Sequence, residues 1–345
     1  MSMAEVTVRG AGVFGLSIAW ECARRGAKVR VIEREGVGAG SSGGVVGALA
    51  PHVPENWNPK KAFQLESLLA AEQFWAGVKA AGGVDPGYAR TGRVQPVAPG
   101  GEALARARAE GAKALWQGRA EWRVIGVEEA PAFRPVSATG LYVHDTVTAR
   151  LHPARACTAL VAALEAAGAE VVIGEAEARG PVVWATGAAG LAALSEDVGR
   201  TVGVPIKGQA ALLHFEAPEA AQLFADGLHV VPHADGTVAI GSTSERDFDG
   251  LGTDGQLDVL LEKACALVPL LHGAQVLKRW AGLRPRARSR APMLGPWPGR
   301  EGHFVANGGF KIGFGMAPGV ARVMADLVLD GSDAIPDGFR VEDSL

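Results

Sequence analysis

A glycine pattern near the N-terminus constrains the fold more than any other feature of the sequence. In the segment VRGAGVFGLSIAWECARRGAKVRVIERE, residues 8–35, Gly10, Gly12 and Gly15 form the spacing GxGxxG. In a strand–turn–helix unit, the first glycine permits the tight turn, the second lets the backbone approach a pyrophosphate, and the third lets the helix pack on the strand. The pattern therefore predicts a parallel βαβ unit that binds a dinucleotide.

The segments around these glycines have the matching periodicity. Apolar spacing predicts a strand over residues 5–8, a helix over 13–25 and a second strand over 28–33. Glu33 ends the second strand about 20 residues beyond the first glycine, where a carboxylate can accept hydrogen bonds from an adenosine ribose. These features fit a nicotinamide dinucleotide and a flavin dinucleotide equally well.

A glycine-rich segment distinguishes the two cofactors. Residues 36–47, GVGAGSSGGVVG, contain six glycines, whereas a nicotinamide-binding domain normally continues into another helix and strand. A long stretch of bare backbone suits a bulky cofactor that remains bound. We therefore favour a flavin.

Length and composition narrow the class of protein. With 345 residues, the chain is long enough for about two domains. A net charge of −3 provides no overall field that would attract DNA or an acidic membrane. The three cysteines lie far apart and indicate neither a disulfide framework nor a zinc site. Because we find no signal peptide and no apolar run of about 18 residues, we expect a cytoplasmic protein without a membrane span.

The remaining segments alternate between helical and extended patterns. We expect helices over about 60–81, 101–115 and 255–268, and antiparallel strands between 204 and 245 with HADGT as a hairpin turn. The last part, HFVANGGFKIGFGMAPGVARVMADLVLDG, has the pattern of a strand, a glycine turn and a helix whose N-terminus faces a ligand.

With these motifs in this order, the chain resembles the glycine oxidase and D-amino-acid oxidase group of FAD-dependent oxidoreductases. The resemblance covers nearly the whole chain and includes, after the first glycine motif, WATGAAG, PIKGQ, WAGLRP, APMLG and NGGFKIGFGMAPG. It implies an α/β fold in which a Rossmann-like FAD-binding domain is interleaved with an antiparallel-sheet α+β substrate domain. We assign residues 1–85, 145–203 and 284–345 to the first domain and residues 86–144 and 204–283 to the second.

The resemblance also implies which residues contact FAD. Glu33 and Arg34 would meet the adenosine, and the glycine turn near residue 310 would surround the flavin edge. The complete implied set is Gly10, Gly12, Val13, Phe14, Gly15, Glu33, Arg34, Ser41, Ser42, Val46, Gly47, Ala48, Val172, Thr186, Gly187, Gly309, Phe310, Lys311, Ile312, Gly313, Phe314 and Gly315. Since no cysteine follows Cys265, we expect FAD to be bound noncovalently.

Three residues are implied in catalysis. Arg284, in GLRP, occupies the position that binds the substrate carboxylate, and a forked guanidinium suits that role. Lys311 would place a second cation above the flavin, and His229 takes a position where many relatives present a tyrosine. His229 and His233 form HxxxH, but on a strand their rings would lie about 13 Å apart, so we expect no metal site.

The function implied is oxidative deamination of glycine, a small D-amino acid or an N-alkyl glycine, by hydride transfer to the flavin. The electron acceptor would be oxygen or, in an amino-acid dehydrogenase, a quinone, and a homo-oligomer is compatible with the sequence. One alternative is dealkylation of a carboxymethylaminomethyl group on tRNA, because RPRARSRAP supplies Arg284, Arg286, Arg288 and Arg290, which would share one face of an extended chain. A flavoprotein sensor without turnover is a third class.

Overall fold

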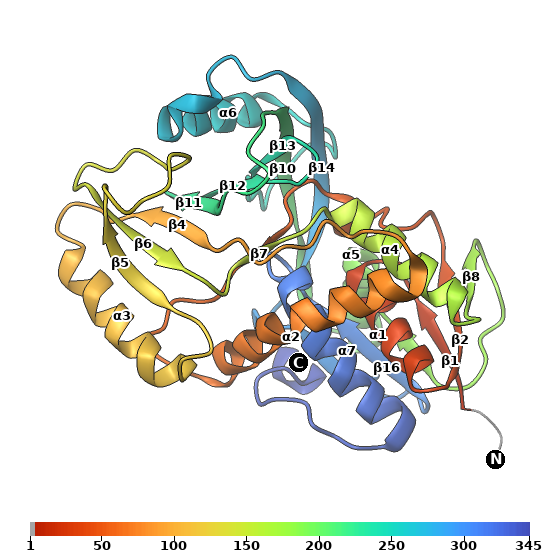
Figure 1. The fold of residues 1–345 in the computed structure, drawn as a ribbon. Helices are drawn as coiled ribbons and strands as arrows, with labels where there is room; N and C mark the ends of the chain where they lie inside the picture. The colour runs from red at the N-terminus through yellow and green to blue at the C-terminus, as the bar shows by residue number, and fades with distance from the viewer. Residues whose placement is uncertain (1–3) are drawn as a thin grey trace.

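The computed structural model describes residues 4–345 and contains two large β-sheets (Figure 1). The first is a six-stranded sheet with the order β15–β16–β9–β1–β2–β8. All its neighbours pair in parallel except β15, which is antiparallel to β16. Its strands are β1 (Glu5–Arg9), β2 (Lys28–Glu33), β8 (Glu170–Ile173), β9 (Val182–Trp184), β15 (Met293–Pro296) and β16 (His303–Asn307).

The expected βαβ unit is present at the centre of this sheet. Helix α1 (Val13–Arg24) connects β1 to β2, and it ends one residue before the predicted boundary. Gly10 has a φ of 107°, and a Cβ on Gly15 would overlap the carbonyl oxygen of Gly10. A side chain at Gly15 would therefore separate α1 from β1, whereas one at Gly10 would need a strained backbone and would overlap the Ala185 carbonyl.

Helices cover the faces of the six-stranded sheet (Figure 1). α1 packs against α7, and α2 packs against both α4 and α7. The predicted helix over 60–81 is α2, which begins after Asn58, whose side chain accepts a hydrogen bond from the Lys61 amide, and ends at Gly83 with a φ of 71°. The helices are α2 (Pro59–Gly82), α4 (Pro153–Ala166), α5 (Gly187–Asp197) and α7 (Gly313–Asp330).

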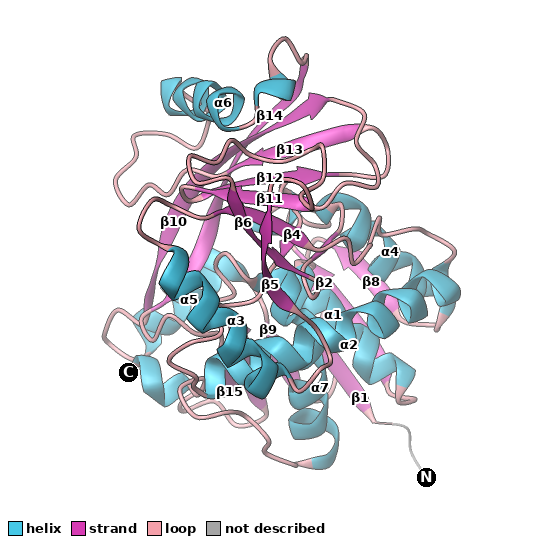
Figure 2. Cartoon of the chain, turned by 60° about the vertical axis from the view of Figure 1, so that its left-hand side comes forward, coloured by secondary structure: helices cyan, strands magenta, loops and turns pink. Residues whose placement is uncertain are grey.

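The second large sheet has eight strands in the order β14–β10–β13–β12–β11–β4–β6–β5 (Figure 2). Its neighbours are antiparallel apart from the parallel pair β11 and β4. The predicted HADGT turn joins β12 to β13. The strands are β4 (Arg93–Pro96), β5 (Trp122–Gly126), β6 (Leu141–Asp145), β10 (Gly203–His214), β11 (Gln222–Ala225), β12 (Leu228–Pro232), β13 (Thr237–Gly241) and β14 (Val276–Ala287).

Two further helices connect strands of this second sheet, one between β4 and β5 and the other between β13 and β14. They are α3 (Glu102–Trp116) and α6 (Gly255–Leu267), close to the predicted ranges. A two-stranded sheet is formed by β3 (Ala48–Leu49) and β7 (Ala149–Arg150), and short 3-10 turns lie at η1 (Ser41–Gly43), η2 (Pro269–Leu271) and η3 (Val341–Ser344). The α/β fold class is therefore confirmed, whereas the domain boundaries stay a prediction, and residue 284 falls inside β14.

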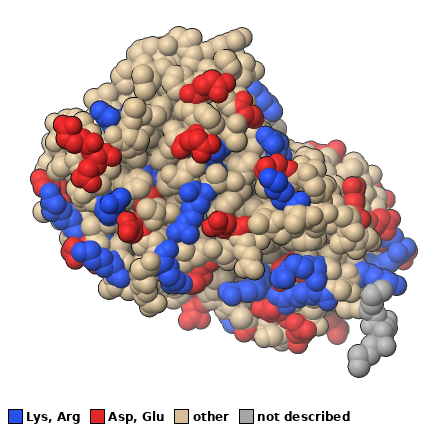
Figure 3. Space-filling view, in the orientation of Figure 1, with Lys and Arg blue, Asp and Glu red and all other residues tan. Residues whose placement is uncertain are grey.

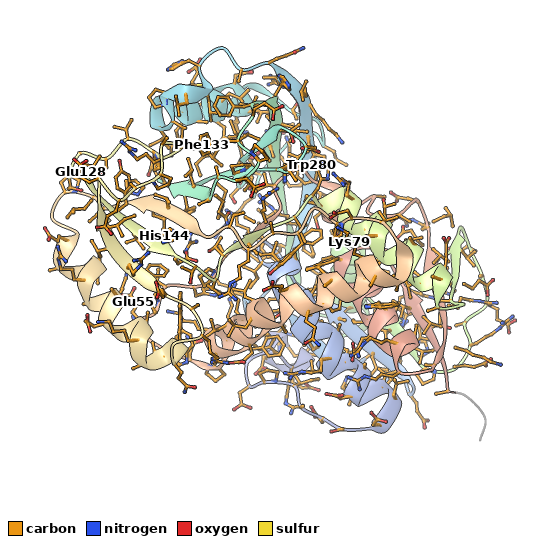
Figure 4. The ribbon with its side chains drawn as sticks, viewed as in Figure 1. Glu55, Lys79, Glu128, Phe133, His144 and Trp280 are labelled. Carbon is orange, nitrogen blue, oxygen red and sulfur yellow. The ribbon has the colours of Figure 1, made fainter. Side chains whose placement is uncertain are left out.

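The eight-stranded sheet packs against the glycine-rich segment that follows β2. Val45 packs in a small core with Ala210, Val231 and Ala239, which come from β10, β12 and β13. Trp280 of β14, labelled in Figure 4, closes this core and lies against Gly44. Because Gly38 N also donates to the Ala11 carbonyl before α1, the glycine-rich segment lies between the start of α1 and the eight-stranded sheet, and the site described below is built around it.

Within residues 4–345, no helix combines the length and the apolar character that crossing a bilayer requires.

Candidate active site

The first part of the site is the N-terminus of α1. Gly12 is the N-cap residue and has no side chain of its own to cap the helix. The Val13 amide donates to Ser42 Oγ at 3.0 Å, and the Ala11 amide donates to Glu33 Oε2 at 2.7 Å. A Cβ on Gly12 would meet only Ser42 within 4 Å, at 3.2 Å from Oγ, so the outer side of this turn is open. A helix start whose N-cap residue is a glycine, with an open turn beside it, fits the pyrophosphate of FAD.

Glu33 is positioned for the adenosine end. Its carboxylate accepts from the amides of Ala11 and Glu35, which fix its orientation at the end of β2. Val172 lies in the neighbouring strand β8, paired in register with Ile32. Arg34 is exposed, and its guanidinium pairs with Glu35 at 2.6 Å. The structure thus brings Glu33 and Val172 to one end of the sheet, with Arg34 directed toward an acidic neighbour.

The C-terminal glycine turn lies against the start of α1. A Cβ on Gly309 would stand 2.9 Å from the Phe14 ring, and one on Gly313 would stand 3.5 Å from Val13. Helix α7 begins at Gly313 with Ile312 as its N-cap residue and has no side-chain cap. Two helix starts whose N-cap residues provide no side-chain cap therefore flank the same region, and each can stabilise negative charge on a bound group.

The other implied FAD residues divide into two groups. Val46 lies beneath β13, since a Cβ on Gly241 would approach Val46 Cγ2 at 2.6 Å. Thr186 precedes α5, and the Gly187 carbonyl accepts from the side-chain Nδ2 of Asn307 at 2.8 Å. By contrast, Gly47 and Gly315 are packed against neighbouring residues. A Cβ on Gly47 would overlap the Leu151 carbonyl, and one on Gly315 would meet Leu68 at 3.2 Å. These last glycines are explained by packing without a ligand. Ser41, Ala48 and Phe314 are partly exposed around the same segments.

Arg284 lies on β14 and is 8% exposed. Its Nη1 donates to Ser242 Oγ at 2.6 Å, and Nη2 donates to the backbone carbonyl of Thr243. The buried Nε has no hydrogen-bond partner. Across the described residues 4–345, no carboxylate lies within ion-pair distance of this guanidinium, although Glu245 is near enough to influence it. Burial lowers the pKa of Arg284 to about 10, so it remains charged at neutral pH.

The strand next to Arg284 holds a buried ionic network that the sequence did not reveal. Lys207 on β10 pairs with Glu245 at 3.2 Å and with Asp254 at 3.1 Å. Gln209 donates to both carboxylates, at 3.0 and 2.9 Å. Lys207 and Gln209 both belong to the PIKGQ motif, so that motif marks a support for the Arg284 site. Ser242 and Thr243 carried no sequence signal.

Lys311 and Phe310 form the edge of the site. Phe310 has a φ of 43°, which is uncommon for a residue with a side chain. Its ring centroid lies 5.6 Å from the Arg284 guanidinium carbon, 5.9 Å from that of Arg286 and 5.8 Å from Lys311 Nζ. Partial desolvation and the charge of Arg284 lower the pKa of Lys311. The structure therefore brings two of the implied catalytic cations to one aromatic ring.

His229 lies on β12, in register with Gly241 of β13. Its ring packs on Phe224 with centroids 4.6 Å apart, and its buried Nδ1 has no partner. Burial, with the charges of Arg93 and Lys311 adding to it, lowers the pKa of His229 to about 3. The imidazole is therefore neutral at physiological pH and can make one further hydrogen bond.

A cavity of about 370 Å³ opens beside Phe310. It shares three arginines with a second cavity of about 570 Å³. The expectation that Arg284, Arg286, Arg288 and Arg290 share one face of an extended chain is wrong, because β14 ends at Ala287 and a turn follows. Arg284 and Arg286 remain on the strand, and Arg288 and Arg290 reach the second cavity from the turn.

Among residues 4–345 the structure contains no cluster of His, Cys, Asp and Glu side chains that could hold a metal ion. Arg284 and Lys311 lie at the Phe310 ring, and His229 packs on Phe224. The open turn at Gly12 fits a flavin dinucleotide. The unpartnered Arg284 Nε and His229 Nδ1 fit a small anionic substrate beside the flavin.

Comparison with known proteins agrees with this geometry. The chain is 29% identical to a glycine oxidase of Pseudomonas putida over 96% of both chains. It is 30% identical to a putative thiamine biosynthesis oxidoreductase ThiO of Rhizobium etli, over 94% of this chain and 96% of that protein. The crystal structure of glycine oxidase from Geobacillus kaustophilus superposes with a TM-score of 0.81 at 23% identity, covering 96% of this chain and 97% of the other, which shows a shared fold.

The resemblance inferred from the motifs is confirmed by these relatives. Residues 5–327 match the family described as FAD dependent oxidoreductase. The chain therefore belongs to the FAD-dependent oxidoreductase family and is an enzyme that uses FAD to oxidise amino compounds at a C–N bond.

Proposed function

We propose that the enzyme oxidises glycine, a small D-amino acid or an N-alkyl glycine to the corresponding imine, which water hydrolyses to an oxo acid and ammonia or an amine. The observation that carries this proposal is Arg284, a buried guanidinium that has no carboxylate partner among the described residues. A buried charge without a partner is costly. An α-carboxylate of the substrate would supply the missing negative charge.

We infer that FAD is held at the starts of α1 and α7. The α1 start at Gly12 and Val13, with Ser42, would bind the pyrophosphate, and Glu33 would bind the adenosine ribose. The α7 start at Gly313 would face the flavin edge. When bound, FAD supplies the electron sink that accepts a hydride from the substrate α-carbon. We expect FAD to be held without a covalent bond.

The side chains of this protein orient and polarise the substrate. Arg284 can grip a carboxylate through two N–H groups, because Nε and the Nη groups form a rigid fork. Lys311, whose Nζ lies 5.8 Å from the centroid of the Phe310 ring, adds positive charge. Positive charge near the substrate favours the neutral form of its amine, which is the form that can release a hydride. Because His229 stays neutral, its unpartnered Nδ1 would be available to hydrogen-bond the substrate.

The test is anaerobic mixing of the purified holoenzyme with glycine, sarcosine, D-alanine and L-alanine while the flavin absorbance is recorded. We expect bleaching by one or more of the first three and none by L-alanine. Bleaching by simple amines that lack a carboxylate, with no response to any amino acid, would contradict the proposal. Reoxidation by oxygen compared with a soluble quinone then identifies the acceptor class.

A further inference from the structure

The cavity beside the proposed catalytic residues is lined by cations. It is bordered by His52, Lys60, Arg246, Arg286, Arg290, Gly308, Phe310, Lys311 and Ile312. The second cavity, which shares Arg246, Arg286 and Arg290, adds Arg200 and Arg288. Neither lining includes an aspartate or a glutamate. On the face drawn in Figure 3, lysine and arginine are interspersed with acidic residues, so the uniform charge of these cavities is a local feature.

The three shared arginines lack the ion pairs that arginines form elsewhere in this protein. Arg279, Arg300 and Arg340 each have a carboxylate oxygen within 2.8 Å. In the part of the chain that the structure describes, Arg246, Arg286 and Arg290 form no ion pair with a carboxylate. Several guanidiniums gathered without counter-charge raise the local concentration of anions. An anionic ligand would relieve their mutual repulsion.

The backbone brings these arginines to the site from three places. Arg286 is two residues beyond Arg284 on β14, so the two share one face about 7 Å apart, and both guanidiniums lie over the Phe310 ring. Arg246 follows Glu245, whose backbone amide and carbonyl both bond to Lys207. Arg290 has a φ of 60°, and its carbonyl accepts from Lys60 Nζ. The cluster is therefore built by tertiary structure beside Arg284.

We propose that Arg246, Arg286 and Arg290 form a second anion subsite, which selects an N-substituted glycine whose N-substituent ends in a carboxylate or a phosphonate. This inference rests on the proposed function, because Arg284 is taken to hold the glycine carboxylate. A CH₂–NH–CH₂ link would place the reacting C–N bond between the two anions. The cavity volume of about 370 Å³ lies in the range of small-molecule pockets, which favours such a ligand over a nucleic acid.

The decisive experiment uses two ligands that have no amine and cannot be oxidised to an imine. Methoxyacetate carries one carboxylate, and diglycolate carries two with the same ether link. Their binding to the holoenzyme is measured by calorimetry and by the perturbation of the flavin spectrum. We expect diglycolate to bind about tenfold more tightly than methoxyacetate or better, the effect of one well-placed charge contact, with a preference that falls as salt is added.

The variants assign that preference to residues. In Arg246→Gln and Arg286→Gln, the ratio of the two affinities should fall by about tenfold. Arg322→Gln is the matched control, because Arg322 is an exposed arginine on α7 that lines neither cavity, and its ratio should equal that of the wild type. Equal binding of both ligands by the wild type, or an unchanged ratio in both arginine variants, would overturn the subsite.

Turnover separates the subsite from the proposed function and identifies the anion. Iminodiacetate and N-(phosphonomethyl)glycine are compared with sarcosine in anaerobic flavin reduction, and the better of the two dianions names the terminal group. If diglycolate is preferred but no amine reduces the flavin, the proposed function fails and the subsite stands. If sarcosine reduces the flavin without any preference for dianions, the subsite alone fails. Displacement of diglycolate by micromolar tRNA at low salt would instead assign the arginines to a nucleic acid.

Discussion

Replacing Arg284 by alanine should remove most of the affinity of the enzyme for its amino-acid substrate. In the wild type, the guanidinium is 8% exposed and is oriented by Ser242 Oγ at 2.6 Å and by the Thr243 carbonyl. A substrate carboxylate that enters this site loses water and gains a forked, charged donor. Without Arg284, that carboxylate is desolvated with no partner.

The size of the loss follows from this burial. Removing one partner of a buried ion pair typically costs about 3–5 kcal/mol, which corresponds to a factor of about two hundred to a few thousand in affinity. Arg284→Lys keeps the charge but not the fork, so it should recover only part of the loss. Ser242→Ala removes one orienting hydrogen bond and should weaken binding by about tenfold or less.

The assay is anaerobic flavin reduction across substrate concentrations for the wild type and the three variants. Flavin content and the thermal midpoint are measured alongside, and we expect both to be retained in Arg284→Ala, because the variant removes a buried charge that has no carboxylate partner. An Arg284→Ala enzyme that binds FAD and shows unchanged concentration dependence would refute the carboxylate-anchor reasoning. A loss of flavin instead would show that Arg284 supports the cofactor site, and Arg284→Lys would then test the anchor.

Three further outcomes are expected. Gly12→Val should not retain FAD, because its side chain would crowd Ser42 and the open side of the cradle; a yellow variant with full FAD content would contradict this placement. Acid precipitation of the wild type should release intact FAD, whereas flavin that stays with the polypeptide would indicate a covalent bond. Burial lowers the pKa of His229 to about 3 and that of His233 to about 4. The unfolded chain therefore binds more protons below pH 6.5, and the free energy of unfolding should fall as the pH is lowered from about 6.5 to 5. In denaturant titrations, a His233→Asn variant should lose less of this free energy over the same range. An identical dependence of the free energy of unfolding on pH in variant and wild type would exclude this histidine as a source.

The βαβ unit could be predicted from the sequence because its determinants are local. A Cβ on Gly15 would collide with Gly10, five residues away, and the apolar stripe of α1 follows directly from the spacing of residues in a helix. The hairpin between β12 and β13 was predictable for the same reason, since its turn residues are adjacent in sequence. The flavin preference rested on glycines within a single segment.

The Arg284 site could be only half anticipated from the sequence. The motif GLRP singled out the arginine, but nothing in the sequence indicated that Ser242 and Thr243 would orient it or that Glu245 would pair with Lys207 beneath it. These contacts join residues about forty positions apart, and they exist because β10 pairs with both β13 and β14.

The basic subsite was decided by tertiary structure alone. On the sequence, the arginines from 284 to 290 read as one extended face, whereas the end of β14 at Ala287 divides them between a strand and a turn. Arg246 and Lys60, which lie far away in the sequence, complete the cavity. Side-chain period determines faces only while the backbone stays regular, so the charge that surrounds the site depends on where the strand ends and which distant segments fold against it.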